Sequence, residues 1–193
     1  MCIRDSVLAS QSPRRQELLA RIGVEDFKTL SLDIDESYPE GLSPEDTVRY
    51  IAKKKCDAAA ALCAPDDLII TADTMVFLDN DRLGKPRDEE DALRMLRALS
   101  GRGHTVCTGV SVRRGAQEER FAVSTRVFFR PMTDDEIRAY IKTGEPMDKA
   151  GAYGVQSRGA LFVERIDGDF FNVMGLPVEQ LGLVLARFGV KLL

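Results

Sequence analysis

The sequence predicts an α/β fold in which a mixed, twisted sheet is flanked by helices. Strand-like segments, some continuously apolar and some alternating, are interspersed with amphipathic segments that carry helix-capping residues. The length of 193 residues suits one domain over residues 1–193, with a core large enough to be built as two lobes. No repeat, low-complexity tract or linker divides the chain, so we expect one continuous fold.

Five segments combine helical spacing of apolar residues with residues that favour helix starts. Ser12 and Ser43 each precede a proline, which is typical of an N-cap followed by the first helical residue. Thr133 and Glu136 form a capping box, and Gly23 is placed to end the first helix. The helices are expected at residues 13–22, 43–63, 88–99, 133–143 and 177–188.

Two patterns indicate strands. Residues 68–72 are a mostly apolar run typical of a buried strand, which we expect to end at Asp73. Apolar and polar side chains alternate in residues 120–129, as in a half-buried strand. Strands are expected at residues 7–9, 68–72, 75–78, 105–112 and 120–129, with further strands in the glycine-rich stretch 144–175.

Composition and charge narrow the class of protein. The formal net charge is -4 and the pI is about 5.2, whereas binding to nucleic-acid phosphates is typical of basic proteins. No apolar run approaches the roughly 18 residues of a membrane helix, and residues 1–6 do not resemble a secretory signal. The four cysteines form no CxxC pair. We therefore expect a cytoplasmic protein with no nucleic-acid or membrane partner.

The chain has a single histidine, His104. A Ser-His-Asp hydrolase is nearly excluded because this one residue would have to be the base. A metal site with several histidines is impossible. Any metal chemistry must therefore use oxygen ligands, which favours magnesium or manganese.

Three basic residues stand in unusual positions. Arg14 and Arg15 occupy the first turn of a predicted helix, where the helix dipole disfavours positive charge, so they are candidates for binding an anion. Lys55 follows Ile51 by four residues and falls within the apolar stripe of its helix. The alternatives are a solvated arginine pair and a lysine that extends along the core surface to water.

Further candidates are acidic or lie in glycine-rich loops. Asp73 is predicted at the carboxyl end of a buried strand, where a carboxylate can bind a metal or accept a proton, although aspartates that cap turns are common. Glu36 lies in an acidic loop that is otherwise expected to be merely solvated. Lys85, within Gly-Lys-Pro, adds positive charge, and Gln156 can present a donor and an acceptor to a nucleobase edge.

Long strings of this sequence resemble the Maf family of nucleoside triphosphate pyrophosphatases, which is related in fold to the inosine triphosphate pyrophosphatases. The resemblance runs from about Val7 to the C-terminus and implies a two-lobed fold with a central cleft. It is carried by LASQSPRRQELL, ITADTMVFLDNDRLGKP, LSGRGHTVCTGV and EPMDKAGAYGVQSRGALFVERIDGDFFNVMGLP.

The resemblance implies a role for each candidate in cleaving a nucleoside triphosphate to its monophosphate and pyrophosphate. Asp73 would activate water, and Glu36 and Asp73 would hold a divalent metal cation, Mg or Mn. The residues implied to bind the triphosphate are Ser10, Arg15, Lys55 and Lys85. Arg14, Thr74 and Gln156 match the subgroup that acts on dTTP and UTP, for which modified pyrimidine nucleotides are also implied. A homodimer is implied as well.

Other interpretations stay open at this point. The chain could be a nucleotide-binding regulator of cell division without turnover, as the family's link to septum formation inhibition suggests, or a 7-methyl-GTP pyrophosphatase. A nucleic-acid-binding module is disfavoured by the acidic pI. Residues 1–6 depart from the family's usual opening and are expected to form an atypical N-terminal extension, because Arg4 and Asp5 put charge where strand residues belong.

Overall fold

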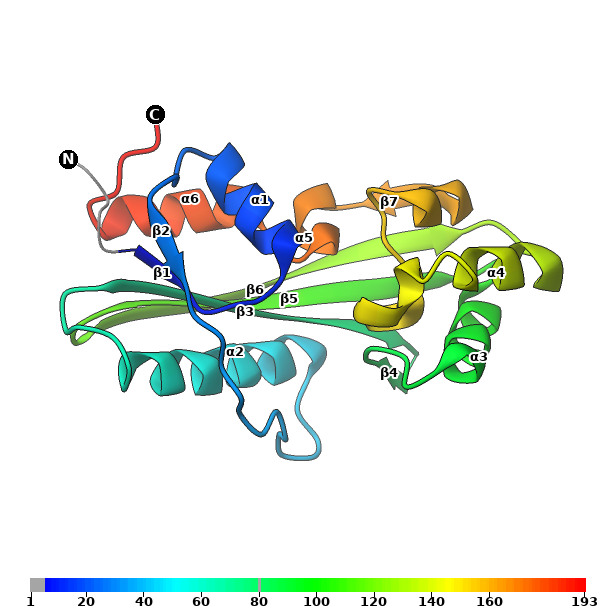
Figure 1. Cartoon of the computed structure of the whole chain (residues 1–193), viewed down its shortest axis with the longest axis horizontal. Coiled ribbons are helices and arrows are strands. Elements are labelled where there is room, and N and C mark those ends of the chain that lie inside the picture. Colours follow the sequence, from blue (N-terminus) through cyan, green and yellow to red (C-terminus); the bar gives the residue numbers. More distant parts are fainter. Residues whose placement is uncertain (1–5, 80) are drawn as a thin grey trace. The chain divides into compact units, whose positions relative to one another are not determined.

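The computed structural model describes residues 6–79 and 81–193, and it confirms the α/β class with a mixed sheet and flanking helices (Figure 1). The strands are β1 (Ser6–Leu8), β2 (Phe27–Thr29), β3 (Leu68–Leu78), β4 (Asp81–Leu83), β5 (Gly103–Arg114), β6 (Gln117–Phe129) and β7 (Val163–Asp167). In the described residues they form one sheet in the order β2-β1-β3-β5-β6-β7, and β4 pairs with β3. The sheet is mixed, since β1 runs parallel to β2 and β3 whereas β4 and β7 are antiparallel to their partners.

Helices form where the capping residues predict them. The α-helices are α1 (Pro13–Arg21), α2 (Pro44–Ala60), α3 (Glu89–Leu99), α4 (Asp134–Ile141), α5 (Phe170–Met174) and α6 (Val178–Arg187). Ser43 accepts a hydrogen bond from the Asp46 amide, and the capping box of Thr133 and Glu136 is complete. Ser12 stands at the N-cap of α1, but its side chain makes no capping bond.

Two predictions about these elements are wrong. The second helix ends at Ala60 rather than near Cys63, and Leu62, within the range predicted as helix, is 68% exposed. The glycine-rich stretch 144–175 holds a single strand, β7. Before it the chain folds into three short 3-10 helices, η1 (Glu145–Asp148), η2 (Ala150–Ala152) and η3 (Arg158–Phe162). Gly144 and Gly151 have φ values of 75° and 69°, which turn the backbone away from an extended path.

The chain falls into two compact units, each assembled from separate segments. Unit 1 comprises the residues up to Asp73 together with Thr108–Val123 and Gly175–Leu193, and unit 2 comprises Thr74–Cys107 and Ser124–Met174. The single domain over residues 1–193 and the central cleft stay predictions. Of the expected extension at residues 1–6, the first five lie outside the described residues. Ser6 is fully buried in β1, so for Ser6 the prediction is wrong.

In unit 1, α2 covers one face of the strands, and α1 and α6 cover the other (Figure 1). Val48 and Ile51 on α2 are fully buried, as is Ile70 on β3. The helix approaches β5 so closely that a Cβ atom on Gly109 would collide with the backbone of Val48. Two turns further along α2, Lys55 reaches Asp73 on β3.

In unit 2, α3 and α4 pack against each other. Leu93, Leu96 and Leu99 of α3 are buried, as their spacing predicts. His104, Phe129 and Tyr153 form a buried aromatic cluster with edge-to-face contacts between all three rings. Across both units, no helix of the described residues has the length and apolar character needed to cross a bilayer.

Candidate active site

Lys55 and Asp73 form the centre of a charged cluster in unit 1. Lys55 Nζ lies 2.7 Å from Asp73 Oδ1 and 2.8 Å from Glu36 Oε1. The side chains of Lys55 and Asp73 are only 14% and 9% exposed, whereas that of Glu36 is 55% exposed. The lysine thus reaches an internal acidic site instead of extending to water, and one ammonium group joins two carboxylates that are far apart in sequence.

Asp73 occupies a different place on its strand from the one predicted. It lies inside β3, which continues to Leu78, and not at the strand's carboxyl end. The parallel partner β1 is shorter, and its pairing with β3 stops at Leu8 opposite Ile70. Asp73 therefore lies just beyond the end of the parallel pairing, although its own strand runs on. An apolar run alone could not predict this, because strand length depends on the partner strands.

One oxygen of Asp73 has no hydrogen-bond partner. Oδ2 is buried and unbonded, while Oδ1 accepts from Lys55. A buried carboxylate oxygen without a partner is costly unless a cation, a water molecule or a ligand donates to it. This oxygen is therefore the position of the cluster that is open to a cation, a water molecule or a ligand.

Glu36 is held beside α2 by its neighbours in the acidic loop. Lys54 Nζ donates to the carbonyl of Ser37 at 3.1 Å and lies 3.5 Å from Asp35 Oδ2. Hydrogen bonds from Ser37, with a smaller contribution from Lys54, hold the pKa of Asp35 below its usual value. Sequence reasoning assigned no role to Lys54, yet Lys54 and Lys55 together tie the loop to the helix.

Arg15 brings a second cation close to the same carboxylates. Its Nε donates to the carbonyl of Gly175 at 2.8 Å, and its Nη1 donates to Ser10 Oγ at 3.3 Å. Burial lowers the pKa of Arg15, and the charges of Asp73 and Glu36 act in the opposite direction. The guanidinium is thus oriented by a backbone carbonyl that no sequence signal indicated. Ser10 Oγ also accepts from the Ser12 amide at 3.2 Å.

The carboxylate oxygens of this cluster are ligands of the kind that suits a hard divalent cation. Glu36 and Asp73 already share one positive group, and the unbonded Oδ2 of Asp73 offers a further oxygen. Carboxylate oxygens are the ligands that magnesium and manganese prefer. No group of three or more His, Cys, Asp or Glu side chains suited to a metal occurs in residues 6–79 and 81–193. The protein part of such a site would therefore be these two carboxylates.

The remaining predicted site residues are distributed over both units. Arg14 is half-buried at the start of α1 in unit 1. In unit 2, Thr74 is half-buried in β3, Lys85 is exposed in the loop after β4, and Gln156 is exposed between η2 and η3. The structure therefore brings Glu36, Lys55 and Asp73 together, with Arg15 oriented nearby in the same unit.

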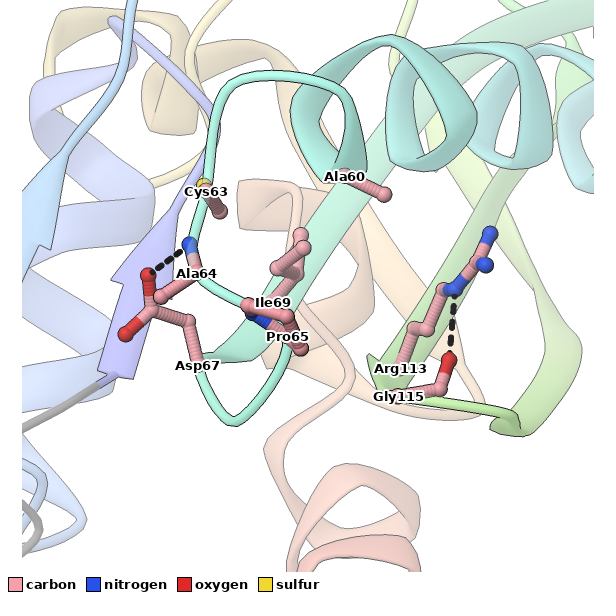
Figure 2. Close-up of a pocket in the computed structure, with 8 residues that line it drawn as sticks. All are labelled: Ala60, Cys63, Ala64, Pro65, Asp67, Ile69, Arg113 and Gly115. Carbon is pink, nitrogen blue, oxygen red and sulfur yellow. Dashed lines mark hydrogen bonds between the residues drawn. The ribbon is translucent and has the colours of Figure 1, made fainter.

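Two other features do not belong to this cluster. A pocket in unit 1 is lined by Ala60, Cys63, Ala64, Pro65, Asp67, Ile69, Arg113 and Gly115, none of which is a predicted site residue (Figure 2). Arg113 Nε there donates to the Gly115 carbonyl at 3.0 Å (Figure 2). In unit 2, His104 Nε2 lies 2.8 Å from the hydroxyl of Tyr153, and burial lowers the pKa of His104 to about 4. The histidine is therefore neutral at pH 7 and structural.

The chain is similar to known proteins over almost its whole length. The family model described as Maf-like protein matches residues 5–188. A dTTP/UTP pyrophosphatase of Bacillus velezensis is 48% identical over 185 residues, which cover 96% of this chain and 97% of that protein. A dTTP/UTP pyrophosphatase of Pelotomaculum thermopropionicum is 45% identical over 193 residues, which cover 99% of this chain and 100% of that protein.

A solved structure matches at the level of the fold. A HAM1 protein from Coxiella burnetii aligns with a TM-score of 0.53 over 94% of this chain and 98% of that one. Its sequence identity is 15%, so the likeness concerns the fold alone.

Proposed function

Because this chain belongs to the family of Maf-like proteins, we propose that it hydrolyses dTTP and UTP to the nucleoside monophosphate and pyrophosphate. The relatives that carry this activity in their names are similar over nearly the whole chain. The structural observation that carries the proposal is the convergence of Glu36 and Asp73 on Lys55, with Arg15 in the same electrostatic environment. Such a cluster combines a proton acceptor with cations for phosphate oxygens.

In the proposed reaction, water attacks the α-phosphorus of the nucleotide. Asp73 accepts a proton from that water, and the bond from the α-phosphorus to the bridging oxygen breaks to release pyrophosphate. Phosphoryl chemistry asks a protein mainly for positioning and charge neutralisation. Lys55 and Arg15 supply positive charge to the triphosphate. A magnesium or manganese ion, held by Glu36 and Asp73 when bound, would neutralise further phosphate charge.

The other predicted site residues are assigned to recognition of the substrate, either of its base or of its triphosphate. In this proposal Arg14, Thr74 and Gln156 select a pyrimidine, and Ser10 and Lys85 assist in binding the triphosphate. Modified pyrimidine nucleotides are further candidate substrates. A homodimer and a cytoplasmic location complete the proposal. In the part of the chain that the structure describes, Cys56 and Cys63 form no disulfide, which suits a reducing compartment.

The test is pyrophosphate release from dTTP, UTP and 7-methyl-GTP, each with manganese or magnesium. We expect turnover of the two pyrimidine nucleotides, with kcat/KM at least about tenfold higher than for 7-methyl-GTP. Binding of these nucleotides without release of pyrophosphate would contradict the proposal and favour the regulator of cell division. A preference for 7-methyl-GTP would contradict the assignment of Arg14, Thr74 and Gln156.

A further inference from the structure

Gln156 lies on a tight turn that is closed by a hydrogen bond between its first and last residues. The Ser157 amide donates to the carbonyl of Gly154 at 3.4 Å, which closes a four-residue turn with Val155 and Gln156 at its centre. Val155 points inward and is 5% exposed, while Gln156 is exposed. A closing bond of this length is weak, so other contacts must fix the turn.

Tyr140 and Glu145 hold both ends of this turn. The Gly154 amide, at its start, donates to the Tyr140 hydroxyl at 3.1 Å. The Ser157 hydroxyl, at its end, donates to Glu145 Oε1 at 2.6 Å. The Tyr140 hydroxyl donates to that same oxygen at 2.7 Å, so both ends are connected through one carboxylate.

Glu145 also binds the backbone that follows the turn. The amide of Arg158 donates to Oε2 and the amide of Gly159 donates to Oε1, each at 3.3 Å. Burial favours a higher pKa for Glu145, but the hydrogen bonds from Ser157, Tyr140, Gly159 and Arg158 together hold that pKa below its usual value. The carboxylate is therefore ionised at neutral pH, and hydrogen bonds to an ionised acceptor are about twice as strong as neutral ones.

Gly159, which follows the turn, packs closely against the start of the turn. A Cβ atom on Gly159 would lie 2.6 Å from the carbonyl oxygen of Gly154 and 2.8 Å from the Tyr140 hydroxyl. Gly154 at the start of the turn and Gly159 after it are therefore in direct contact. Glu145 accepts hydrogen bonds from Ser157, Arg158 and Gly159 in this same region. Its Oε1 and Oε2 receive four donors, all from the turn, its flanks or the tyrosine that binds it.

A pyrimidine base makes strict demands on the residue that selects it. The exposed edge of uracil or thymine presents one N–H donor beside carbonyl acceptors, and a glutamine amide can match it only in one orientation. Selective contacts of this kind must be held to within about 0.5 Å. Gln156 is exposed, and the hydrogen bond that closes its turn is weak. It meets this demand only if contacts from the rest of the protein fix the turn.

We propose that Glu145 is a positioning residue for base recognition, which acts by fixing the Gly154–Ser157 turn and through it the side chain of Gln156. This inference rests on the proposed function, because it takes Gln156 as a residue that selects the pyrimidine. Glu145 itself touches neither the base nor the phosphates in this proposal. Its loss is therefore expected to weaken recognition of the base and to leave recognition of the triphosphate unchanged.

The experiment compares Glu145→Gln with Glu164→Gln, an identical chemical change on an exposed glutamate of β7 in the same unit. For Glu145→Gln we expect the KM for UTP to rise about tenfold with kcat within about twofold, as for a lost binding contact. The inhibition constant of inorganic tripolyphosphate, which has no base, should stay unchanged. Amide hydrogen exchange at Gly154, Arg158 and Gly159 should accelerate without any nucleotide present. Glu164→Gln should change none of these.

Ser157→Ala and Tyr140→Phe provide milder variants that remove one hydroxyl each. Both should raise the KM for UTP, by about threefold, because Ser157→Ala removes the hydrogen bond to Glu145 at the end of the turn and Tyr140→Phe removes those to the Gly154 amide and to Glu145. They keep the test decisive if Glu145→Gln does not fold.

Several results would overturn the role of Glu145. An unchanged KM for UTP, an unchanged exchange rate at the three amides, or an equal loss of UTP and tripolyphosphate binding would each do so. In all of these cases the wild-type chain still releases pyrophosphate. Failure of the wild-type chain to release pyrophosphate from UTP or dTTP would instead overturn the proposed function, and the exchange measurement would still show whether Glu145 orders the turn.

Discussion

The two units hold their predicted site residues by different means. In unit 1 charged side chains contact one another directly, with the ammonium of Lys55 between Glu36 and Asp73. In unit 2 the neutral Gln156 lies on a turn, and the hydrogen bonds of Glu145 go to the backbone and hydroxyl groups around it. Among these residues, ion pairs hold the cluster of unit 1, and hydrogen bonds to Glu145 hold the turn of unit 2. The ion-paired cluster and the hydrogen-bonded turn can therefore be tested separately.

The largest expected effect is on catalysis in unit 1. Asp73→Asn keeps the shape of the side chain but removes the negative charge and the proton acceptor. We expect kcat for UTP to fall by at least about 10³-fold, because the water would lack its base and the cation site one carboxylate. Nucleotide affinity should stay within about fivefold, measured by equilibrium binding.

A matched control is Asp57→Asn on α2, which removes an aspartate that pairs with Lys53 and Arg113 away from the cluster. Its kcat should equal that of the wild type. Near wild-type turnover by Asp73→Asn would remove Asp73 from its assigned role.

The next effect concerns acid stability in unit 2. His104 has a pKa of about 4 in the folded protein and an ordinary value of 6.5 when unfolded. The unfolded chain therefore binds a proton first, and stability is lost as the pH falls from 6.5 to 4. At pH 4 this residue accounts for a loss of about 3 kcal/mol in the free energy of unfolding. Urea unfolding at pH 7 and pH 4.5 should show a smaller drop for His104→Gln than for the wild type.

Equal pH dependence in the two proteins would mean that His104 is more accessible to protons than its burial indicates. With the expected result, the stability of unit 2 requires that His104 stays neutral, whereas the cluster of unit 1 requires that Glu36, Lys55 and Asp73 are ionised.

A third prediction concerns Lys55, whose ammonium now occupies the position between the carboxylates. Lys55→Met keeps the length of the side chain but removes the charged donor of Asp73 Oδ1, at a cost of about 2 kcal/mol of folding free energy. Added manganese should restore part of this stability, because it would take the position of the ammonium. In thermal unfolding the rise in Tm with manganese should be larger in Lys55→Met than in the wild type. An identical rise in both proteins would contradict a shared cation position.

The smallest expected effect is on selection by unit 2. Gln156→Glu should lower kcat/KM for UTP by about tenfold through loss of an amide donor to the base. Turnover of 7-methyl-GTP should rise or stay level, and inhibition by tripolyphosphate should not change. An equal loss for all three compounds would mean that Gln156 affects binding of the phosphates, and its assignment to the base would be wrong.

Local patterns predicted the elements of this fold better than they predicted its contacts. Ser43, Thr133 and the apolar spacing of α3 placed the helices, because capping and amphipathicity act within a few residues. The continuation of β3 through Asp73 was missed, since strand length is set by pairing with distant segments. The glycine-rich stretch was assigned strands because its single-sequence pattern does not distinguish a strand from 3-10 turns.

The candidate site was predictable where a residue conflicted with its local surroundings. Lys55 in an apolar stripe and Arg15 in a first helical turn were both locally unfavourable, and both contact polar partners from distant segments. Glu145 and Tyr140 gave no such signal, because an acidic residue next to a proline and an aromatic residue in a helix are ordinary. Their role depends on contacts 12 and 14 residues apart that only the folded chain reveals.

The central claim is that Glu36 and Asp73 share one cation opposite the positive groups of unit 1. Manganese binding, followed by electron paramagnetic resonance with the non-hydrolysable analogue α,β-methylene-UTP bound, tests it most directly. The wild-type chain should bind one manganese ion, and Glu36→Gln and Asp73→Asn should each weaken that binding by about tenfold or more. Unchanged manganese affinity in both variants would contradict the account.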